Sequence, residues 1–243
     1  TDRVVSPEAR AVVESLVARR VAREPLQYLL GTQEFCGLEF AVSPAVLIPR
    51  PETELLLRHA VASAQAVSDA TIVDVGTGSG CVAITLATSL KGRRIIAVDR
   101  SPEALAVAQR NARRHGVSDR IEWLEGDLLA PLSERMAARS VYVIVSNPPY
   151  ISEADWAGLE PEVRVFEPRM ALIGGKQGTE FHERLLRESL AFLVPGGLLT
   201  MEIGAGQAAA VRRLAEQIGG YTALETIEDT AGIERVVMAR RLK

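Results

Sequence analysis

Residues 71–80 read Thr-Ile-Val-Asp-Val-Gly-Thr-Gly-Ser-Gly. The run Thr71–Val75 is short and rich in Val and Ile, which is typical of a strand buried on both faces. A helical pattern begins at about residue 79, so the glycines lie in the turn between a strand and a helix. Glycine lets such a turn be tight and lets a ligand approach the backbone. The stretch therefore predicts the strand, turn and helix of an α/β fold with a ligand at the turn.

The same alternation continues along the chain. Further apolar runs lie at Arg94–Val98, Arg120–Leu124, Val141–Val145 and Leu198–Ile203, and helical patterns lie near 79–90, 102–115, 131–138, 179–192 and 206–218. Two last runs, Tyr221–Ile227 and Ile233–Ala239, follow without a helix between them, which predicts an antiparallel edge. We expect an α/β fold whose seven-stranded, mostly parallel, Rossmann-like sheet has an antiparallel last strand.

The chain before residue 69 has a different pattern. Ser6-Pro7-Glu8 is typical of a helix start, and that helix is expected to reach about Arg20. Residues 33–48 predict a β-hairpin around Gly37, and a helix is expected over 52–67 after Pro51. We expect three parts: 1–32, a helical and linker segment; 33–68, a hairpin and connecting helix; and 69–243, the main domain.

Composition excludes several classes of protein. The net charge of −3 and the absence of a basic run disfavour direct nucleic-acid binding, and no apolar stretch predicts a membrane span. Cys36 and Cys81 are expected to be buried, reduced thiols of a cytoplasmic protein. No metal is expected, because the histidines His59, His115 and His182 lack metal-ligand spacing.

The glycine turn differs from two common phosphate-binding loops. Cys81 stands where a G-x-G-x-x-G dinucleotide motif has its third glycine, and no Gly-Lys-Ser/Thr of a Walker loop follows. The acid Asp74 would repel a pyrophosphate but suits a ligand with an ammonium group. S-adenosylmethionine (SAM) carries such a group, so we expect Asp74-Val75-Gly76-Thr77-Gly78 to bind it. A glycine turn without a ligand is the alternative.

Two further acids follow the next strands. Asp99 ends the second strand of the main domain, at an offset suited to accepting ribose hydroxyl hydrogens. It could instead only cap the next helix, which has Pro102 at its first turn. Asp127 follows the third strand and could accept the adenine amino group while Leu128 packs on the ring. Asp127 as a plain turn residue is the alternative.

Asn147-Pro148-Pro149-Tyr150 follows the fourth buried strand. The prolines fix φ and lack N–H groups, so they present carbonyls as acceptors. The Asn147 side-chain oxygen and the Pro148 carbonyl can each accept one hydrogen of a planar NH₂ group, and Tyr150 can stack on it. Such an amine or amide is a poor nucleophile that needs this positioning. This segment, the Asn147–Tyr150 corner, predicts methyl transfer to nitrogen. A plain turn at the end of the strand is the alternative.

These residues resemble the release factor glutamine methyltransferase family of the SAM-dependent superfamily. The matching segments are Arg23–Tyr28 with Gly31, Phe35 with Gly37, Leu47–Glu54, Asp74–Gly80, Ser146–Tyr150, Glu167–Arg169 and Pro195–Gly197. The resemblance implies methylation of the side-chain amide N5 of the glutamine in the Gly-Gly-Gln motif of peptide chain release factors. It also implies SAM at Asp74–Gly78, Asp99, Asp127 and Leu128, with Asn147 touching SAM and Asn147–Tyr150 holding the glutamine.

The family has more N-terminal helices than the single helix expected here, and they help to dock the release factor. Gln177-Gly178 also departs from the family's usual acid before glycine. We expect a monomer. The competing hypotheses are an adenine-N6 or guanine-N2 nucleic-acid methyltransferase, which the charge disfavours, and a dehydrogenase-like nucleoside-binding domain, which Cys81 disfavours.

Residues 152–178 form a long, mostly irregular stretch after the Asn-Pro-Pro-Tyr segment, and loops of this length are usually functional. Residues 152–178 are therefore a candidate lid. Trp156 and Phe166 could line a cleft or cover the cofactor, or they could be core residues, which we favour for Phe166.

Overall fold

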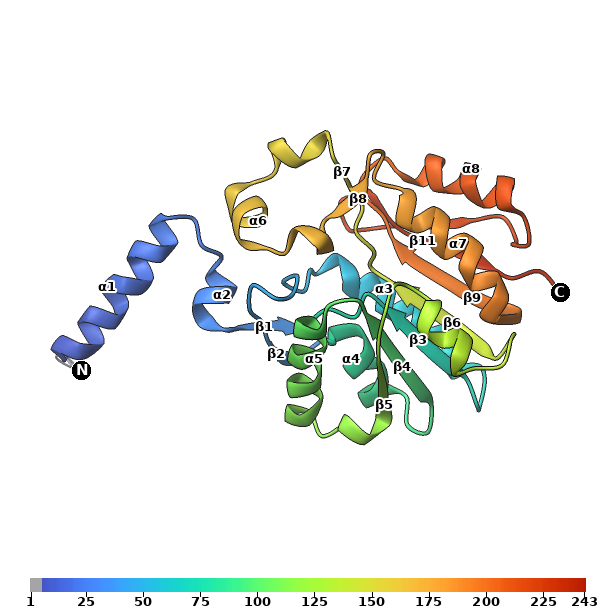
Figure 1. Cartoon of the computed structure of the whole chain (residues 1–243), viewed down its shortest axis with the longest axis horizontal. Coiled ribbons are helices and arrows are strands. Elements are labelled where there is room, and N and C mark those ends of the chain that lie inside the picture. Colours follow the sequence, from blue (N-terminus) through green and yellow to red (C-terminus); the bar gives the residue numbers. More distant parts are fainter. Residues whose placement is uncertain (1–5) are drawn as a thin grey trace.

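The computed structural model describes residues 6–243, and its centre is a seven-stranded sheet (Figure 1). The strand order is β10-β11-β9-β6-β3-β4-β5. The bounds are β3 Thr71–Val75, β4 Arg94–Asp99, β5 Ile121–Glu125, β6 Val141–Ser146, β9 Leu193–Glu202, β10 Glu225–Glu228 and β11 Glu234–Arg240. The predicted α/β fold is confirmed, because β9, β6, β3, β4 and β5 pair in parallel and β11 is antiparallel to β9.

Two details of the predicted strands and helices are wrong. The last two strands, β10 and β11, form the predicted antiparallel edge, but β10 starts at Glu225 rather than at Tyr221. Tyr221 makes only an isolated bridge and donates its hydroxyl to the Leu186 carbonyl at 2.6 Å. The predicted helix 131–138 is only a short 3-10 turn, η2, Ala130–Glu134. Only Leu132 of this turn is buried, and Arg139 has a φ of 56°, so no apolar face extends it into an α-helix.

Helices cover both faces of the sheet because successive strand residues alternate between two cores. The helices are α3 Glu52–Gln65, α4 Cys81–Ser89, α5 Pro102–Arg114, α7 Glu180–Phe192 and α8 Ala208–Ile218. Ile72 of β3 packs in one core with α3, α4 and α5, and its neighbour Val73 packs in the other with α7 and α8. Because β3, β4, β5, β6 and β9 run parallel, their carboxyl ends lie at the same edge of the sheet.

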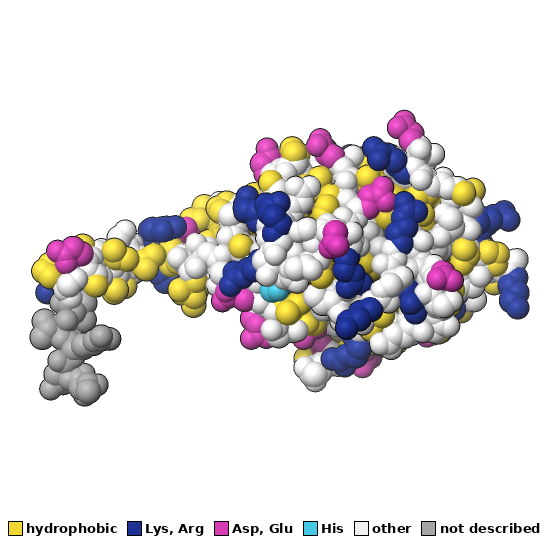
Figure 2. All heavy atoms as spheres, turned by 90° about the horizontal axis from the view of Figure 1, so that it is seen from below, with side chains coloured by type: hydrophobic (Ala, Val, Ile, Leu, Met, Phe, Trp, Pro, Cys, Tyr) yellow, Lys and Arg dark blue, Asp and Glu magenta, His cyan; other side chains and the backbone are white. Residues whose placement is uncertain are grey.

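The N-terminal part carries the predicted helix and hairpin. It consists of α1 Pro7–Val21, α2 Leu26–Leu30, β1 Thr32–Phe35 and β2 Leu38–Ala41. The Ser6 hydroxyl accepts the Ala9 N–H at 3.2 Å, which confirms the predicted cap. Helix α1 buries no residue and projects from the rest of the molecule (Figure 1), and apolar side chains cover much of this arm (Figure 2).

The hairpin is bound to the glycine loop through one side chain of α5. Asn111 is fully buried; its Oδ1 accepts the Ala41 N–H at 2.8 Å, and its Nδ2 donates to the carbonyls of Ala41 and Ser79 at 3.0 and 2.8 Å. Cys36 occupies the hairpin turn with a φ of 50° and is only partly buried, which corrects the prediction of a core thiol. Cys81 is buried as predicted, and both thiols are free.

The stretch after β6 contains only short elements. They are β7 Ile151–Ser152, η3 Asp155–Gly158, α6 Pro161–Phe166, η4 Arg169–Ala171 and β8 Ile173–Gly175. Arg20, near the end of α1, and Arg23, just after it, form ion pairs with Glu160 and Glu162 at 2.6–3.0 Å. These ion pairs tie α6 to the end of α1. Among the helices of residues 6–243, none has the length and apolar character needed to cross a membrane.

Candidate functional site

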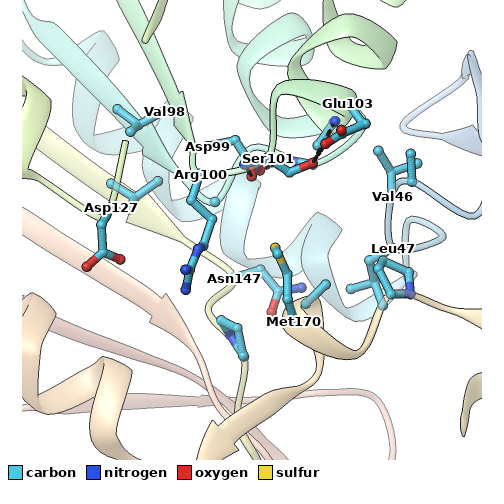
Figure 3. Close-up of a pocket in the computed structure, with 18 of the residues that line it drawn as sticks. Val46, Leu47, Val98, Asp99, Arg100, Ser101, Glu103, Asp127, Asn147 and Met170 are labelled. Atoms are coloured by element: carbon cyan, nitrogen blue, oxygen red, sulfur yellow. Dashed lines mark hydrogen bonds between the residues drawn. The ribbon is translucent and has the colours of Figure 1, made fainter. Parts of the chain in front are cut away.

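A cavity of about 360 Å³ lies where the carboxyl ends of β3, β4, β5 and β6 meet (Figure 3). This is the edge at which open α/β sheets bind ligands. Its walls include Val46, Leu47, Val75, Gly76, Gly78, Val98, Asp99, Arg100, Gly126, Asp127, Leu128, Asn147, Pro149, Met170 and Phe181. Most of these residues are apolar, and the polar groups are few, which is typical of a small-molecule site.

The glycine loop is held against the end of β4. Gly76 and Thr77 both donate their N–H groups to the Val98 carbonyl, at 2.9 and 3.0 Å. Gly80 has a φ of 81°, and a Cβ there would lie 3.0 Å from Ala108 of α5. Only glycine fits this conformation and this close helix packing. The sequence therefore fixes a turn whose backbone at Gly76 and Gly78 forms one wall of the cavity.

Asp74 faces a second, smaller cavity of about 40 Å³ rather than the large one. Its Oδ2 accepts the Thr77 hydroxyl at 2.6 Å and the Ala83 N–H at 3.1 Å. Burial raises the pKa of Asp74 to about 7. Thr77 also lines only this smaller cavity, so the predicted cofactor residues divide between two adjoining spaces.

Asp99 lines the large cavity at the end of β4 (Figure 3). Its Oδ2 accepts the Gly78 N–H at 2.8 Å, and its Oδ1 accepts the Ser101 N–H at 2.9 Å. Ser101, not Asp99, caps α5, because the Ser101 hydroxyl accepts the Ala104 N–H at 3.1 Å. Burial is the main influence on the Asp99 carboxyl and raises its pKa despite the backbone hydrogen bonds.

Asp127 and Leu128 follow β5 on the opposite wall. The Asp127 carboxylate is half exposed and forms an ion pair with Arg184 of α7 at 2.9 Å. Leu128 is buried with a φ of 48°, a conformation that is rare for a residue other than glycine. Such a backbone turns the leucine side chain into the cavity wall, where it offers an apolar face beside an acid.

The Asn147–Tyr150 corner follows β6. Asn147 and Pro149 line the large cavity, whereas Pro148 and Tyr150 do not. The Asn147 Nδ2 donates to the Thr53 hydroxyl of α3 at 3.1 Å, and the Tyr150 hydroxyl donates to Glu202 Oε1 at 3.3 Å. Asn147 also lines the smaller cavity, so it stands where the two spaces adjoin.

Two side chains that the sequence did not single out hold this corner in place. Glu202, at the end of β9, is 1% exposed and accepts the hydroxyls of Thr53 and Tyr150. Gln207 donates through Nε2 to the Tyr150 carbonyl at 2.8 Å. An acid inside an apolar strand is a signal for a special role, because carboxylates are seldom fully buried without partners. No sequence signal marked Gln207.

The rim of the large cavity comes from segments remote in the sequence. Pro168, Arg169, Met170 and Ala171 line it from one side, and Ala45–Leu47 from another. The buried Glu167 carboxylate forms an ion pair with Arg50 and accepts the Ile48 N–H at 3.1 Å, so it joins the two segments. Within residues 6–243, no group of three His, Cys, Asp or Glu side chains could hold a metal ion.

The two aromatic candidates of the 152–178 stretch lie outside the cavity wall. Phe166 packs against the buried cluster that contains Tyr28 and Val46, which confirms the favoured core role. Trp156 is partly buried and stacks under the Arg169 guanidinium, 5.2 Å from the ring centroid. Its contribution to the cavity is therefore indirect, through a residue that does line it.

Comparisons with known proteins agree with this geometry. Residues 51–158 match the family model "Methyltransferase small domain", and residues 1–31 match "PrmC N-terminal domain". A structure titled as a methyltransferase from Pyrococcus furiosus has a TM-score of 0.60 at 17% identity and covers 98% of this chain and 100% of its own. The hMettl16 catalytic domain, solved in complex with MAT2A 3'UTR hairpin 6, has a TM-score of 0.65 at 13% identity and covers 93% of this chain and 91% of its own. These likenesses show the fold.

Curated relatives cover nearly the whole chain. The release factor glutamine methyltransferase of Geobacter sulfurreducens is 46% identical over 98% of this chain and 81% of its own length. The protein of the same name from Nitratidesulfovibrio vulgaris is 43% identical over 99% of this chain and 80% of its own. With this identity over this length, and with the fold and the Asn-Pro-Pro-Tyr corner in place, the chain is an enzyme that belongs to the release factor glutamine methyltransferase family.

Proposed function

We propose that this enzyme transfers the methyl group of SAM to the side-chain amide N5 of the glutamine in the Gly-Gly-Gln motif of peptide chain release factors. The observation that carries the proposal is the position of Asn147, which lines both the large and the small cavity. A side chain at that junction can touch a cofactor on one side and an acceptor group on the other. Asn147 is therefore assigned to both the catalytic and the cofactor-binding residues.

The large cavity fits the nucleoside part of SAM. Its volume lies within the range of small-molecule sites, at about 300–1,000 Å³. Asp99 would accept ribose hydroxyl hydrogens, Leu128 would pack on the adenine ring, and Asp127, which now pairs with Arg184, would accept the adenine amino group. The backbone of Val75, Gly76 and Gly78 forms the adjoining wall.

The smaller cavity suits the ammonium group of SAM. Asp74 and Thr77 line it, and an ammonium group beside Asp74 would favour the ionised carboxylate that burial otherwise disfavours. When SAM is bound, it supplies an electrophilic methyl carbon on a sulfonium. The protein's part is to place the acceptor nitrogen in line with that carbon.

The acceptor amide is held by two oxygens. Asn147 Oδ1 accepts one amide hydrogen and the Pro148 carbonyl accepts the other, which raises the electron density on nitrogen and aims its lone pair. The Tyr150 ring stacks on the planar amide group. No general base acts before methyl transfer, because the methylated amide can release its proton afterwards.

We further propose that different segments of the chain have different roles. Residues 1–32 and the hairpin segment 33–68 contribute to docking of the release factor, and 69–243 carry the chemistry; the match of residues 1–31 to the "PrmC N-terminal domain" model supports the first boundary. We propose that the enzyme is a monomer. The cytoplasm, where release factors act, is the proposed location.

Labelled SAM tests the proposal. The purified enzyme is incubated with a release factor, a duplex DNA and an RNA in separate reactions, and incorporated label is counted. Label on the release factor that disappears when its Gly-Gly-Gln glutamine is replaced by alanine supports the proposal. Label on DNA or RNA, with an unlabelled release factor, overturns it in favour of a nucleic-acid methyltransferase.

A further inference from the structure

Two buried side chains, Thr53 and Glu202, and the partly buried Asn147 form a chain of hydrogen bonds behind the acceptor site. The Thr53 hydroxyl of α3 donates to Glu202 Oε2 at 2.6 Å, and Asn147 Nδ2 donates to the Thr53 oxygen at 3.1 Å. Thr53 and Glu202 are 4% and 1% exposed, so water does not compete for the hydrogen bond between them. Neither residue lines the large cavity, and Glu202 lines neither cavity.

The chain of bonds has a fixed direction. A hydroxyl has one hydrogen, and above a pH of about 7, where Glu202 is ionised, its carboxylate oxygens can only accept. Because the Thr53 hydrogen is committed to Glu202, the Thr53 oxygen can only accept from Asn147. The amide of Asn147 must then turn its NH₂ group toward Thr53 and its Oδ1 away from it. A flipped amide would place two acceptors, Oδ1 and the Thr53 oxygen, against each other.

We propose that Thr53 and Glu202 are positioning residues that fix the polarity of the Asn147 amide, so that Oδ1 faces the acceptor nitrogen. This inference rests on the proposed function and deepens it. A fixed Oδ1 accepts from an NH₂ group but repels a carbonyl or carboxylate oxygen. The network therefore selects the orientation in which the substrate glutamine presents its nitrogen, and it disfavours glutamate at the same place.

The same carboxylate also holds the other end of the corner. Glu202 Oε1 accepts the Tyr150 hydroxyl at 3.3 Å, so one side chain of β9 fixes both Asn147, through Thr53, and Tyr150. His182 of α7 contacts the Glu202 backbone carbonyl at 2.8 Å. Of the charged groups near this carboxyl, Glu52 of α3 opposes its ionisation and Arg235 of β11 favours it.

Thr53→Val tests the proposal because valine keeps the shape of threonine and removes the hydroxyl. We expect kcat for release-factor methylation to fall about 10- to 100-fold, since the Asn147 amide loses its fixed polarity. The loss in kcat should exceed any change in the Kd for SAM, because Thr53 lines only the smaller cavity and the nucleoside site is unaltered. Thr53→Ser retains the hydroxyl and should restore kcat to within about threefold of the wild type.

Thr85→Val is the matched control. Thr85 is equally buried, but its hydroxyl donates to the Cys81 carbonyl within α4 and lies outside both cavities. It reports what removal of a buried threonine hydroxyl does to the fold alone, and melting temperatures are measured for all variants. Thr53→Ala serves as a second hydroxyl-free variant if Thr53→Val does not fold.

The outcomes separate this inference from the proposed function. A wild-type enzyme that leaves the release factor unmethylated contradicts the proposed function. A wild-type enzyme that methylates it, with Thr53→Val as active as Thr85→Val, overturns the positioning role alone. An equal loss in Thr53→Ser and Thr53→Val would overturn it too, because the hydroxyl would then not be the group that matters.

Discussion

The carboxylate of Asp99 accepts the backbone N–H of Gly78 at 2.8 Å, which ties the acid at the end of β4 to the glycine loop after β3. Both residues line the large cavity. The acid and the loop are therefore one unit. A change in Asp99 removes a ligand contact and also releases the turn that forms the adjoining wall.

Asp99→Ala should weaken SAM binding first. Loss of hydrogen bonds to a charged group corresponds to about 10- to 100-fold in Kd. Titration calorimetry measures the change, and Glu125→Ala is the control, because Glu125 pairs with Asp99 in register at the end of β5 but lies outside the cavity wall. Unchanged affinity in Asp99→Ala would count against the ribose role.

Asn147→Ala should have the opposite effect and lower kcat far more than the affinity for SAM. Removal of one oxygen that acts on the reacting group is expected to lower kcat about a hundred- to a thousandfold. The Kd for SAM should stay within about threefold, because Asp99 and the glycine loop remain. Steady-state kinetics and calorimetry on the same preparation compare the two effects. A loss of SAM affinity as large as the loss of kcat would contradict the separation of roles.

Glu202 should make the stability of the fold depend on pH. Burial is the largest influence on this carboxyl and raises its pKa from the ordinary value of 4.5 to about 7. Between these pH values the unfolded chain has released the proton while the folded protein still holds it. The contribution of Glu202 to the unfolding free energy of the wild type therefore falls as the pH rises through this window.

Glu202→Gln isolates this contribution, because Asp74 and His182, which also have shifted pKa values, titrate alike in both proteins. The unfolding free energy of the variant minus that of the wild type should increase between pH 5 and about pH 8. Urea unfolding at several pH values measures the difference. A difference that stays constant, or that decreases with pH, would show that Glu202 is ionised throughout.

The Arg50–Glu167 ion pair should stabilise the contact between the two segments at the cavity rim, Ala45–Leu47 and Pro168–Ala171. Glu167 is 1% exposed at its side chain and Arg50 is 30% exposed, so Glu167→Ala leaves a partly buried cation without its partner. Removal of one partner of a fully buried pair costs about 3–5 kcal/mol, and the exposure of Arg50 places the expected loss below that range. Chemical denaturation measures it.

Glu122→Ala is the control for this pair. Arg94 and Glu122 form an exposed ion pair at 2.7 Å, with side chains 50% and 34% exposed. Its removal should cost less than about 1 kcal/mol. If Glu167→Ala costs no more than Glu122→Ala, the buried pair does not stabilise the rim.

Most of the fold could be predicted from the sequence because the signals for its strands and helices are local. Runs such as Thr71–Val75 are apolar on both faces, and the pattern changes to a helical one at the glycine turn. Predictions were wrong where an element depends on its surroundings. Residues 131–138 form only η2 because little of the segment is buried, and Tyr221 lies outside β10 because its hydroxyl reaches Leu186.

The candidate site was predictable only where its residues follow strand ends. Asp99, Asp127 and Asn147 lie at the carboxyl edge of the sheet, as their positions after strands imply. Thr53 and Glu202 are 149 residues apart in the chain, so no spacing rule connects them. The rim residues Pro168–Ala171 reach the cavity through the Arg50–Glu167 pair, which is likewise a tertiary contact.

Tandem mass spectrometry of a release factor after reaction with SAM and the enzyme tests the central claim most directly. We expect one added methyl group, located on the side chain of the glutamine in the Gly-Gly-Gln motif, and at least about a hundredfold less of it with Asn147→Ala at the same enzyme concentration and time. A methyl group on any other residue, or an unmodified release factor with a fully folded enzyme that binds SAM, would contradict it.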